Sequence, residues 1–140
     1  MDISNFPMVT TCTGSFLAFS LGMVWYHPQA LGRSWLKSRR LEGASADPTP
    51  TPFVVSFMLW MLASTFFTFL TEMLHIHDPA GLLCLASLLW VAFAMPPTIM
   101  GALYTGYPFQ AAAIDSAYQL AGYYVIAVVH VVAGFMHYQH

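Results

Sequence analysis

Four long runs of this sequence contain no charged residue. No Asp, Glu, Lys or Arg occurs in residues 3–32, 48–71, 79–114 or 116–140. A helix needs about 20 mainly apolar residues to cross about 30 Å of bilayer hydrocarbon, so each run is long enough for one crossing. The sequence therefore predicts an all-α, polytopic membrane protein, a four-helix bundle with transmembrane helices near residues 7–26, 53–73, 81–103 and 111–137.

The overall composition excludes several other classes of protein. Hydrophobic residues make up 58% of the chain and charged residues 7%, against about 45–50% and about 25% in a typical soluble domain. A net charge of −2 offers no basic stripe for phosphates, so we expect no nucleic-acid partner. We therefore treat residues 1–140 as a single membrane domain whose surroundings are mainly the lipid bilayer.

The third charge-free run contains the pair Pro96-Pro97, which allows two structures. Proline inside a helix removes a hydrogen bond and clashes with the preceding turn. The helix then either kinks at the prolines and continues to about residue 103, or ends near Met95 and leaves residues 98–110 as a re-entrant or interfacial segment. We favour the kinked helix.

All four basic residues fall in one stretch, Arg33, Lys37, Arg39 and Arg40. The positive-inside rule predicts that this loop, residues 27–52, is cytoplasmic and that both termini are not. The protein would then be a multi-pass protein of the cell membrane or a similar membrane. Within the loop, residues 34–41 are compatible with a short interfacial helix, and residues 45–52 form a proline-rich linker.

Small residues spaced four apart occur on the first and fourth predicted helices. They are Gly14, Ala18 and Gly22 on the first helix, and Ala113, Ala117 and Ala121 on the fourth. Such strips let two helix backbones approach closely in a membrane. The pattern predicts helix packing, either within the chain or with another chain, and we expect the protein to form an oligomer.

One face of the fourth predicted helix is polar along its length. At about 100° per residue, it gathers Asp115, Gln119, Tyr123, His130 and His137. Ionisable groups in a membrane usually face the bundle interior or a wet cavity. This polar seam is compatible with a proton or solute path, with a ligand site around His130, or with hydrogen bonds between helices, which we favour.

A second group of polar residues, His75, His77 and Asp78, follows the second predicted helix. Imidazole and carboxylate suit transition metals, so these residues are candidate metal ligands, but we favour the explanation that they are solvated interfacial side chains. His130 could serve as an axial ligand of haem or a pigment. We assign no cofactor. Cys12 and Cys84 are expected to be buried free thiols, and we find no catalytic motif.

The turn after the first predicted helix carries a distinctive motif: Gly22, Trp25, Tyr26, Pro28, Gly32 and Trp35. This stretch resembles a family of small four-helix bacterial and fungal membrane proteins of unknown function, in which Gly-x-x-Trp-Tyr-x-Pro is followed by Phe-Gly-Lys-x-Trp. Leu31 and Arg33 replace the usual Phe and Lys, and Asp115 lies in a second similar segment, residues 114–118. The resemblance implies four helices but no activity. By residue type alone, the aromatic residues of this interfacial motif would anchor at the membrane surface.

Taken together, these features favour a non-enzymatic structural or accessory subunit of a homo- or hetero-oligomer. A small channel or transporter that uses the polar seam is the main alternative. A metal, haem or pigment binder is a further one.

Overall fold

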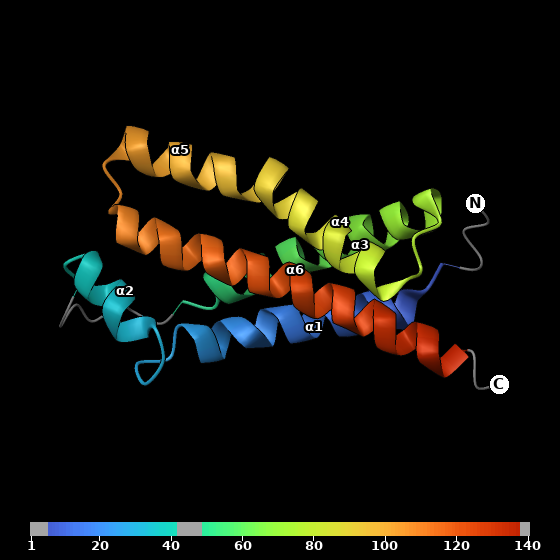
Figure 1. The fold of residues 1–140 in the computed structure, drawn as a ribbon. Helices are drawn as coiled ribbons and strands as arrows, with labels where there is room; N and C mark the ends of the chain where they lie inside the picture. The colour runs from blue at the N-terminus through green and yellow to red at the C-terminus, as the bar shows by residue number, and fades with distance from the viewer. Residues whose placement is uncertain (1–5, 42–48, 138–140) are drawn as a thin grey trace.

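The computed structural model describes residues 6–41 and 49–137, and in this part of the chain it is helical without strands (Figure 1). The elements are α1 (Met8–Trp25), α2 (Gly32–Ser38), α3 (Thr51–Leu74), α4 (Pro79–Leu89), the π-helix η2 (Trp90–Ala94), α5 (Met95–Thr105) and α6 (Phe109–His137). Four stretches are long and apolar enough to cross a membrane: Met8–Trp25, Thr51–Leu74, Pro79–Thr105 and Phe109–Met136. The chain is thus a multi-pass membrane protein, as its charge-free runs predicted.

The third span is one continuous helix with a widened turn in its middle. The backbone N–H of Met95 donates to the carbonyl of Trp90, five residues back, immediately before Pro96 and Pro97. Such a π turn makes room for proline rings that would otherwise clash with the preceding turn. The Trp90 indole also donates to the backbone carbonyl of Ser116 on α6 at 2.8 Å, which fixes the widened turn against that helix. The kinked helix is therefore the correct alternative.

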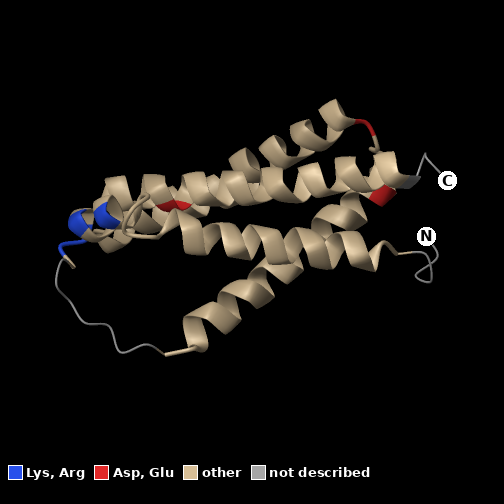
Figure 2. Ribbon diagram, turned by 90° about the horizontal axis from the view of Figure 1, so that it is seen from below, with Lys and Arg blue, Asp and Glu red and all other residues tan. Residues whose placement is uncertain are grey.

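Helix α6 lies in the middle of the bundle, between α1 on one side and the α4–α5 span on the other (Figure 1). Helix α3 packs mainly on α1, and its first turns diverge from the other helices (Figure 2). Helix α1 begins and α6 ends at one end of the bundle, here called the terminal end. The Lys and Arg residues lie at the opposite end, here called the basic end (Figure 2).

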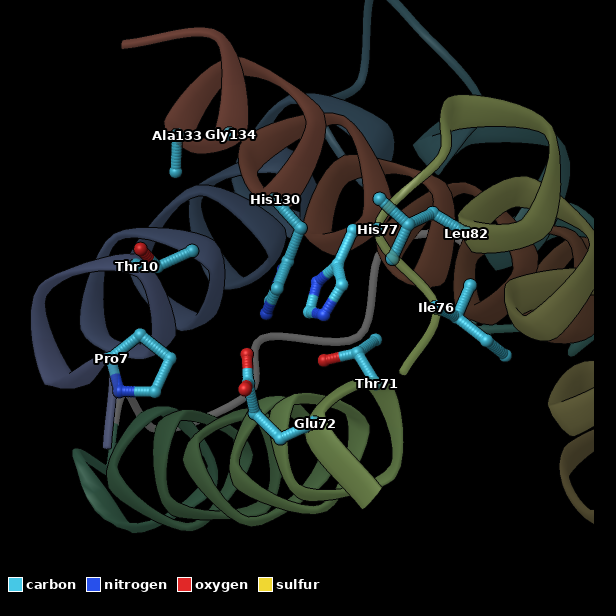
Figure 3. Close-up of a pocket in the computed structure, with 10 residues that line it drawn as sticks. All are labelled: Pro7, Thr10, Thr71, Glu72, Ile76, His77, Leu82, His130, Ala133 and Gly134. Atoms are coloured by element: carbon cyan, nitrogen blue, oxygen red, sulfur yellow. The ribbon is translucent and has the colours of Figure 1, made fainter. Parts of the chain in front are cut away.

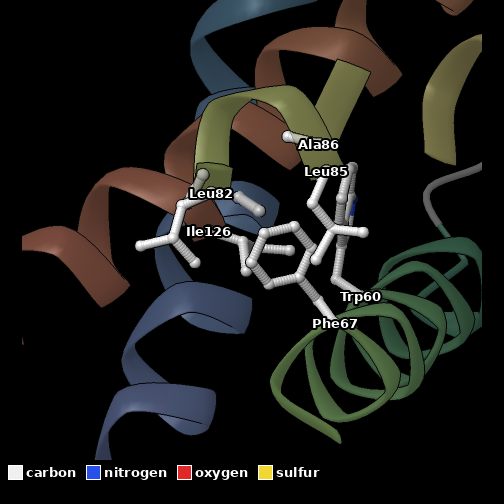
Figure 4. Close-up of a cluster of buried hydrophobic side chains, with 8 residues drawn as sticks. Trp60, Phe67, Leu82, Leu85, Ala86 and Ile126 are labelled. Atoms are coloured by element: carbon white, nitrogen blue, oxygen red, sulfur yellow. The ribbon is translucent and has the colours of Figure 1, made fainter. Parts of the chain in front are cut away.

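The apolar core lies where α1, α3, α4 and α6 meet (Figure 4). Its largest fully buried side chains are Phe67, Leu82 and Ile126. A layer of buried hydroxyls lies beside this core between α1 and α3, where the Thr11 and Thr68 hydroxyls are 2.9 Å apart. The Ser64 hydroxyl donates to the Thr11 carbonyl at 2.9 Å. These hydrogen bonds join the two helices without placing an unpaired polar group in lipid.

The two strips of small residues have different surroundings. On α1, Gly14 and Ala18 are buried, and a methyl group at Gly14 would lie 3.1 Å from the Ser64 hydroxyl. Gly22 leaves room for the ring of Tyr118, whose hydroxyl would be 2.7 Å from such a methyl. This strip lets α1 approach both α3 and α6.

On α6, Ala113 and Ala117 are exposed and Ala121 is half-buried, so this strip does not form the close contacts of α6 within the chain. The buried small residues of α6 are instead Ala111, Ala112, Ser116, Gly122 and Ala127. Packing of the strip at Ala113, Ala117 and Ala121 against another chain stays a prediction. Cys12 and Cys84 are free, but the expectation that their thiols are buried was wrong, because both residues are exposed.

Candidate functional site

The polar seam of α6 lines two separate cavities. Asp115, Gln119 and Tyr123 line a cavity of about 490 Å³ toward the basic end. His130 lines a second cavity of about 290 Å³ at the terminal end. The side chain of the fifth seam residue, His137, lies outside the described part of the structure.

The Asp115 carboxylate accepts three hydrogen bonds from three different segments. The Tyr26 hydroxyl donates to Oδ1 at 2.6 Å, and the Trp35 indole donates to the same oxygen at 2.9 Å. The Tyr107 hydroxyl donates to Oδ2 at 2.6 Å. Asp115 thus ties the end of α1, helix α2 and the α5–α6 turn to α6. Sequence analysis missed Tyr107, because a single Tyr within a Gly-Tyr-Pro turn carries no distinguishing pattern.

The interfacial motif supplies most of these donors. Trp25, which ends α1, donates its indole N–H to the Ile114 carbonyl at 3.2 Å, next to the bonds from Tyr26 and Trp35. The polar atoms of the three aromatic residues therefore contact α6, and their anchoring at the membrane surface stays a prediction. The physical reason is that a carboxylate surrounded by apolar helices needs hydrogen-bond donors.

Two further residues of the motif shape the turn between α1 and α2. Pro28 is exposed within this turn. Gly32 is buried, and a methyl group there would overlap the backbone carbonyl of Tyr26. Only glycine permits this close approach, which brings Trp35 back to Asp115.

Arg39 covers the outer side of this cluster. Its guanidinium lies 4.7 Å from the ring centre of Trp35 and 5.1 Å from that of Tyr107. Burial, with the hydrogen bond to Asp115 as a second cause, raises the pKa of Tyr107 to about 12. The same two causes raise the pKa of Tyr26 further above its ordinary value. Both phenols therefore stay protonated and remain donors at neutral pH.

The cavity beside Asp115 is walled by aromatic rings and by a few polar groups. Its lining is Tyr26, Ser56, Leu59, Trp60, Ala63, Thr98, Asp115, Tyr118, Gln119 and Tyr123. The indole of Trp60 donates to the hydroxyl of Tyr118 at 2.7 Å, and that hydroxyl donates to the carbonyl of Ala18 at 3.1 Å. The side-chain oxygen of Gln119 lies 3.3 Å from the hydroxyl of Thr98. These contacts join α1, α3, α5 and α6 around the cavity.

At the terminal end, the side chains of Glu72, His77 and His130 converge on the second cavity (Figure 3). His130 Nδ1 lies 2.9 Å from the carbonyl of Ile126, which can only accept, so we assign a proton to Nδ1. Nε2 lies 3.0 Å from the hydroxyl of Thr68. The single proton of that hydroxyl has two acceptors within reach, the neutral Nε2 and the Ser64 carbonyl at 2.9 Å. His130 is thereby joined to the hydroxyl layer between α1 and α3.

The three candidate metal ligands do not form one site. His75 ends α3 with a left-handed backbone (φ 55°), and Asp78 caps α4 by accepting from the Gly81 N–H at 2.7 Å. His77 turns toward His130 and Glu72 instead (Figure 3). Among the described residues, no group of three or more His, Cys, Asp or Glu side chains is arranged to hold a metal ion. Helix-end geometry therefore explains two of the three residues.

Comparison with known proteins places the chain in a family. The family model described as "Protein of unknown function (DUF1761)" matches residues 9–131, which covers all four membrane-spanning stretches up to the last turns of α6. No curated protein and no solved structure matches the chain. The resemblance to a family of unknown function is thus confirmed, and the chain is a multi-pass membrane protein of the DUF1761 family.

Proposed function

We propose that this protein is not an enzyme, and that it binds a small solute between its helices and moves it along the polar seam as a small transporter. One observation supports this proposal. The seam lines a cavity near each end of the bundle, with Asp115 at one and His130 at the other. Hydrogen bonds between helices would explain polar side chains along the seam, but they would not explain why ionisable side chains lie beside cavities.

The two turns between the cavities favour a transporter over an open channel. Tyr123 and His130 are seven residues apart, or about 10 Å along a helix with a rise of 1.5 Å per residue. Ile126 and Ala127, which lie between them, are fully buried against the core. A solute can therefore pass only if helices move. The first turns of α3, which are exposed and diverge from the other helices, are free for such a movement (Figure 2).

We further propose an orientation and a membrane. The positive-inside rule places the basic end, with α2, in the cytoplasm and the terminal end outside, in the cell membrane or a similar membrane. We also propose that the motif around Trp25 and Trp35 is shared by the family, because its residues Tyr26 and Trp35 hold Asp115 in place.

Flux measurements on the full chain in liposomes test the proposal. Currents on solid-supported membranes would be recorded for a panel of inorganic ions, amines, amino acids and organic acids. We expect at least one solute to give a current that Asp115→Asn or His130→Ala abolishes. Ser20→Ala is the control, because Ser20 only donates to the Phe16 carbonyl of its own helix. No current with any solute, from folded protein, would contradict the proposal.

One observation favours a second candidate function, that of a structural or accessory subunit of an oligomer. Ala113 and Ala117 form a flat, exposed strip on α6 that could receive a helix of another chain. Ala117→Leu should then dissociate the oligomer, as measured by light scattering in detergent. Dissociation together with an absence of flux would favour this candidate. Flux that survives dissociation would favour the transporter.

A further inference from the structure

We propose that the cavity at the basic end is a site for an organic ammonium group, bound between the Asp115 carboxylate and the surrounding aromatic rings. This inference rests on the proposed function and names the class of its solute. It also stands as a binding site without transport.

The charge of the cavity favours a cation. Among the described residues that line it, Asp115 is the only Asp, Glu, Lys, Arg or His. The three donors to Asp115 are neutral groups, so they hold the carboxylate without cancelling a negative charge. Arg39 stacks on Trp35 and Tyr107, and none of these three residues lines the cavity. The cavity therefore meets a side of the carboxylate that Arg39 does not cover.

The carboxylate also keeps room for one more donor. A carboxylate has about four lone-pair positions, and three of them are taken by Tyr26, Trp35 and Tyr107. One position remains, on Oδ2. A hard metal ion such as Ca²⁺ takes about six to eight oxygen ligands, which one carboxylate cannot supply. A single N–H donor, or a quaternary ammonium that needs only the charge, fits this position better.

Aromatic rings provide the rest of the site. Trp60 and Tyr118 are 5.6 Å apart between ring centres and inclined at 78°, and Trp60 and Tyr123 are 6.0 Å apart at 69°. Tyr26 and Tyr118 are 5.4 Å apart at 74°. These ring pairs meet edge to face, and all four residues line the cavity. Such aromatic cages attract ammonium groups through the negative faces of the rings, most strongly where water is excluded.

The space next to this site indicates what the nitrogen carries. A third cavity, of about 400 Å³, adjoins the cavity beside Asp115 and shares Tyr26, Ser56 and Tyr118 with it. The rest of its lining consists largely of apolar side chains. These include Phe53 from the diverging first turns of α3. An apolar substituent on the nitrogen can occupy it. The expected ligand is therefore an amphiphilic alkylammonium, from a free amine or from a lipid headgroup.

Equilibrium binding to the full chain tests this site. Radiolabelled choline is the probe, with nanodiscs of phosphatidylglycerol alone, because that lipid has no ammonium group. Competition uses 3,3-dimethyl-1-butanol, which has the shape of choline without its charge. We expect choline to bind at least tenfold more tightly than the alcohol. Equal affinity of the two, or no choline binding, would overturn the proposal.

Three variants locate the bound choline. Asp115→Asn should weaken binding at least tenfold, whereas Asp78→Asn, the same change at a helix cap of the terminal end, should not. Tyr123→Leu should also weaken binding, and Tyr123→Phe should retain it, because the ring supplies the attraction. The Tyr123 pair keeps the test decisive if Asp115→Asn fails to fold. Binding that both Asp115→Asn and Tyr123→Leu leave unchanged would place choline elsewhere.

Two comparisons test where the ammonium group comes from and whether binding at this site is coupled to transport. Nanodiscs of phosphatidylcholine should reduce choline affinity if a lipid headgroup competes for the site, and leave it unchanged if the ligand is a free amine. Choline binding without any flux would support the site and contradict transport. Flux of another solute that depends on Asp115, without choline binding, would support transport and contradict the ammonium site.

Discussion

The ring of Trp60 on α3 lies directly against Gly122 on α6. A methyl group at Gly122 would be 2.5 Å from Cζ2 of this ring and closer still to Cη2. Trp60 is only 8% exposed, and its indole donates to Tyr118 at 2.7 Å. The ring therefore cannot move aside without losing both packing and a hydrogen bond. Gly122→Ala should destabilise the protein for this reason.

The magnitude follows from these contacts and from a matched variant. Overpacking costs about 1–3 kcal/mol and a lost hydrogen bond about 0.5–1.5 kcal/mol, so the expected penalty is about 2–4 kcal/mol. Replacing Gly by Ala in a helix also gains about 1 kcal/mol. Gly134→Ala on the same helix has this gain without a clash, because nothing lies within 4 Å of the added methyl. The difference between the two variants isolates the clash.

Unfolding of both variants in mixed dodecyl sulfate micelles, followed by far-ultraviolet circular dichroism, measures this difference. Gly122→Ala should unfold with a free energy about 2–4 kcal/mol below that of Gly134→Ala. In a Trp60→Ala background the penalty should largely vanish, because the clashing ring is gone. Equal stabilities of the two variants, or a penalty that survives removal of Trp60, would refute this packing of α3 on α6.

Three other predictions concern the polar contacts and the α1–α2 turn. Gly32→Ala should cost about 1–3 kcal/mol in the same assay, whereas Gly101→Ala, which meets no neighbour, should not destabilise. Folding raises the pKa of Tyr107 to about 12, so the protonated phenol stabilises the folded protein fully below pH 10, and this stabilisation is lost as pH rises through about 12. Tyr107→Phe should therefore flatten the pH dependence of the free energy of unfolding in that window. Asp78→Ala should cost about 1 kcal/mol by removing the cap of α4, and Asp78→Asn much less.

The sequence alone determined the number and the approximate limits of the membrane helices. A span must satisfy its backbone hydrogen bonds internally and carry almost no charge, and both requirements act on consecutive residues. The expected span near residues 81–103 is observed at Pro79–Thr105, and the short helix expected near residues 34–41 is observed at Gly32–Ser38. The choice between a kink and a break at Pro96 was decided only by the structure, in which the span continues through Pro96 as α5 (Met95–Thr105).

The sequence also placed Asp115, Gln119, Tyr123 and His130 on one polar face, because helical periodicity is a local property. It could not assign their partners. Tyr26 and Asp115 are 89 residues apart in the chain, and no local pattern links them.

Tertiary structure decided which face of each helix is buried. Ala113 and Ala117 have the spacing of a packing strip but are exposed, and the buried small residue opposite Trp60 is Gly122. In a membrane, lipid-facing and core-facing residues are both apolar, so hydropathy does not distinguish the two faces. The same ambiguity hid the aromatic cavity, because the sequence around Trp60 reads as an ordinary apolar helix. Only the packing of α1, α3 and α6 brings its rings to one carboxylate.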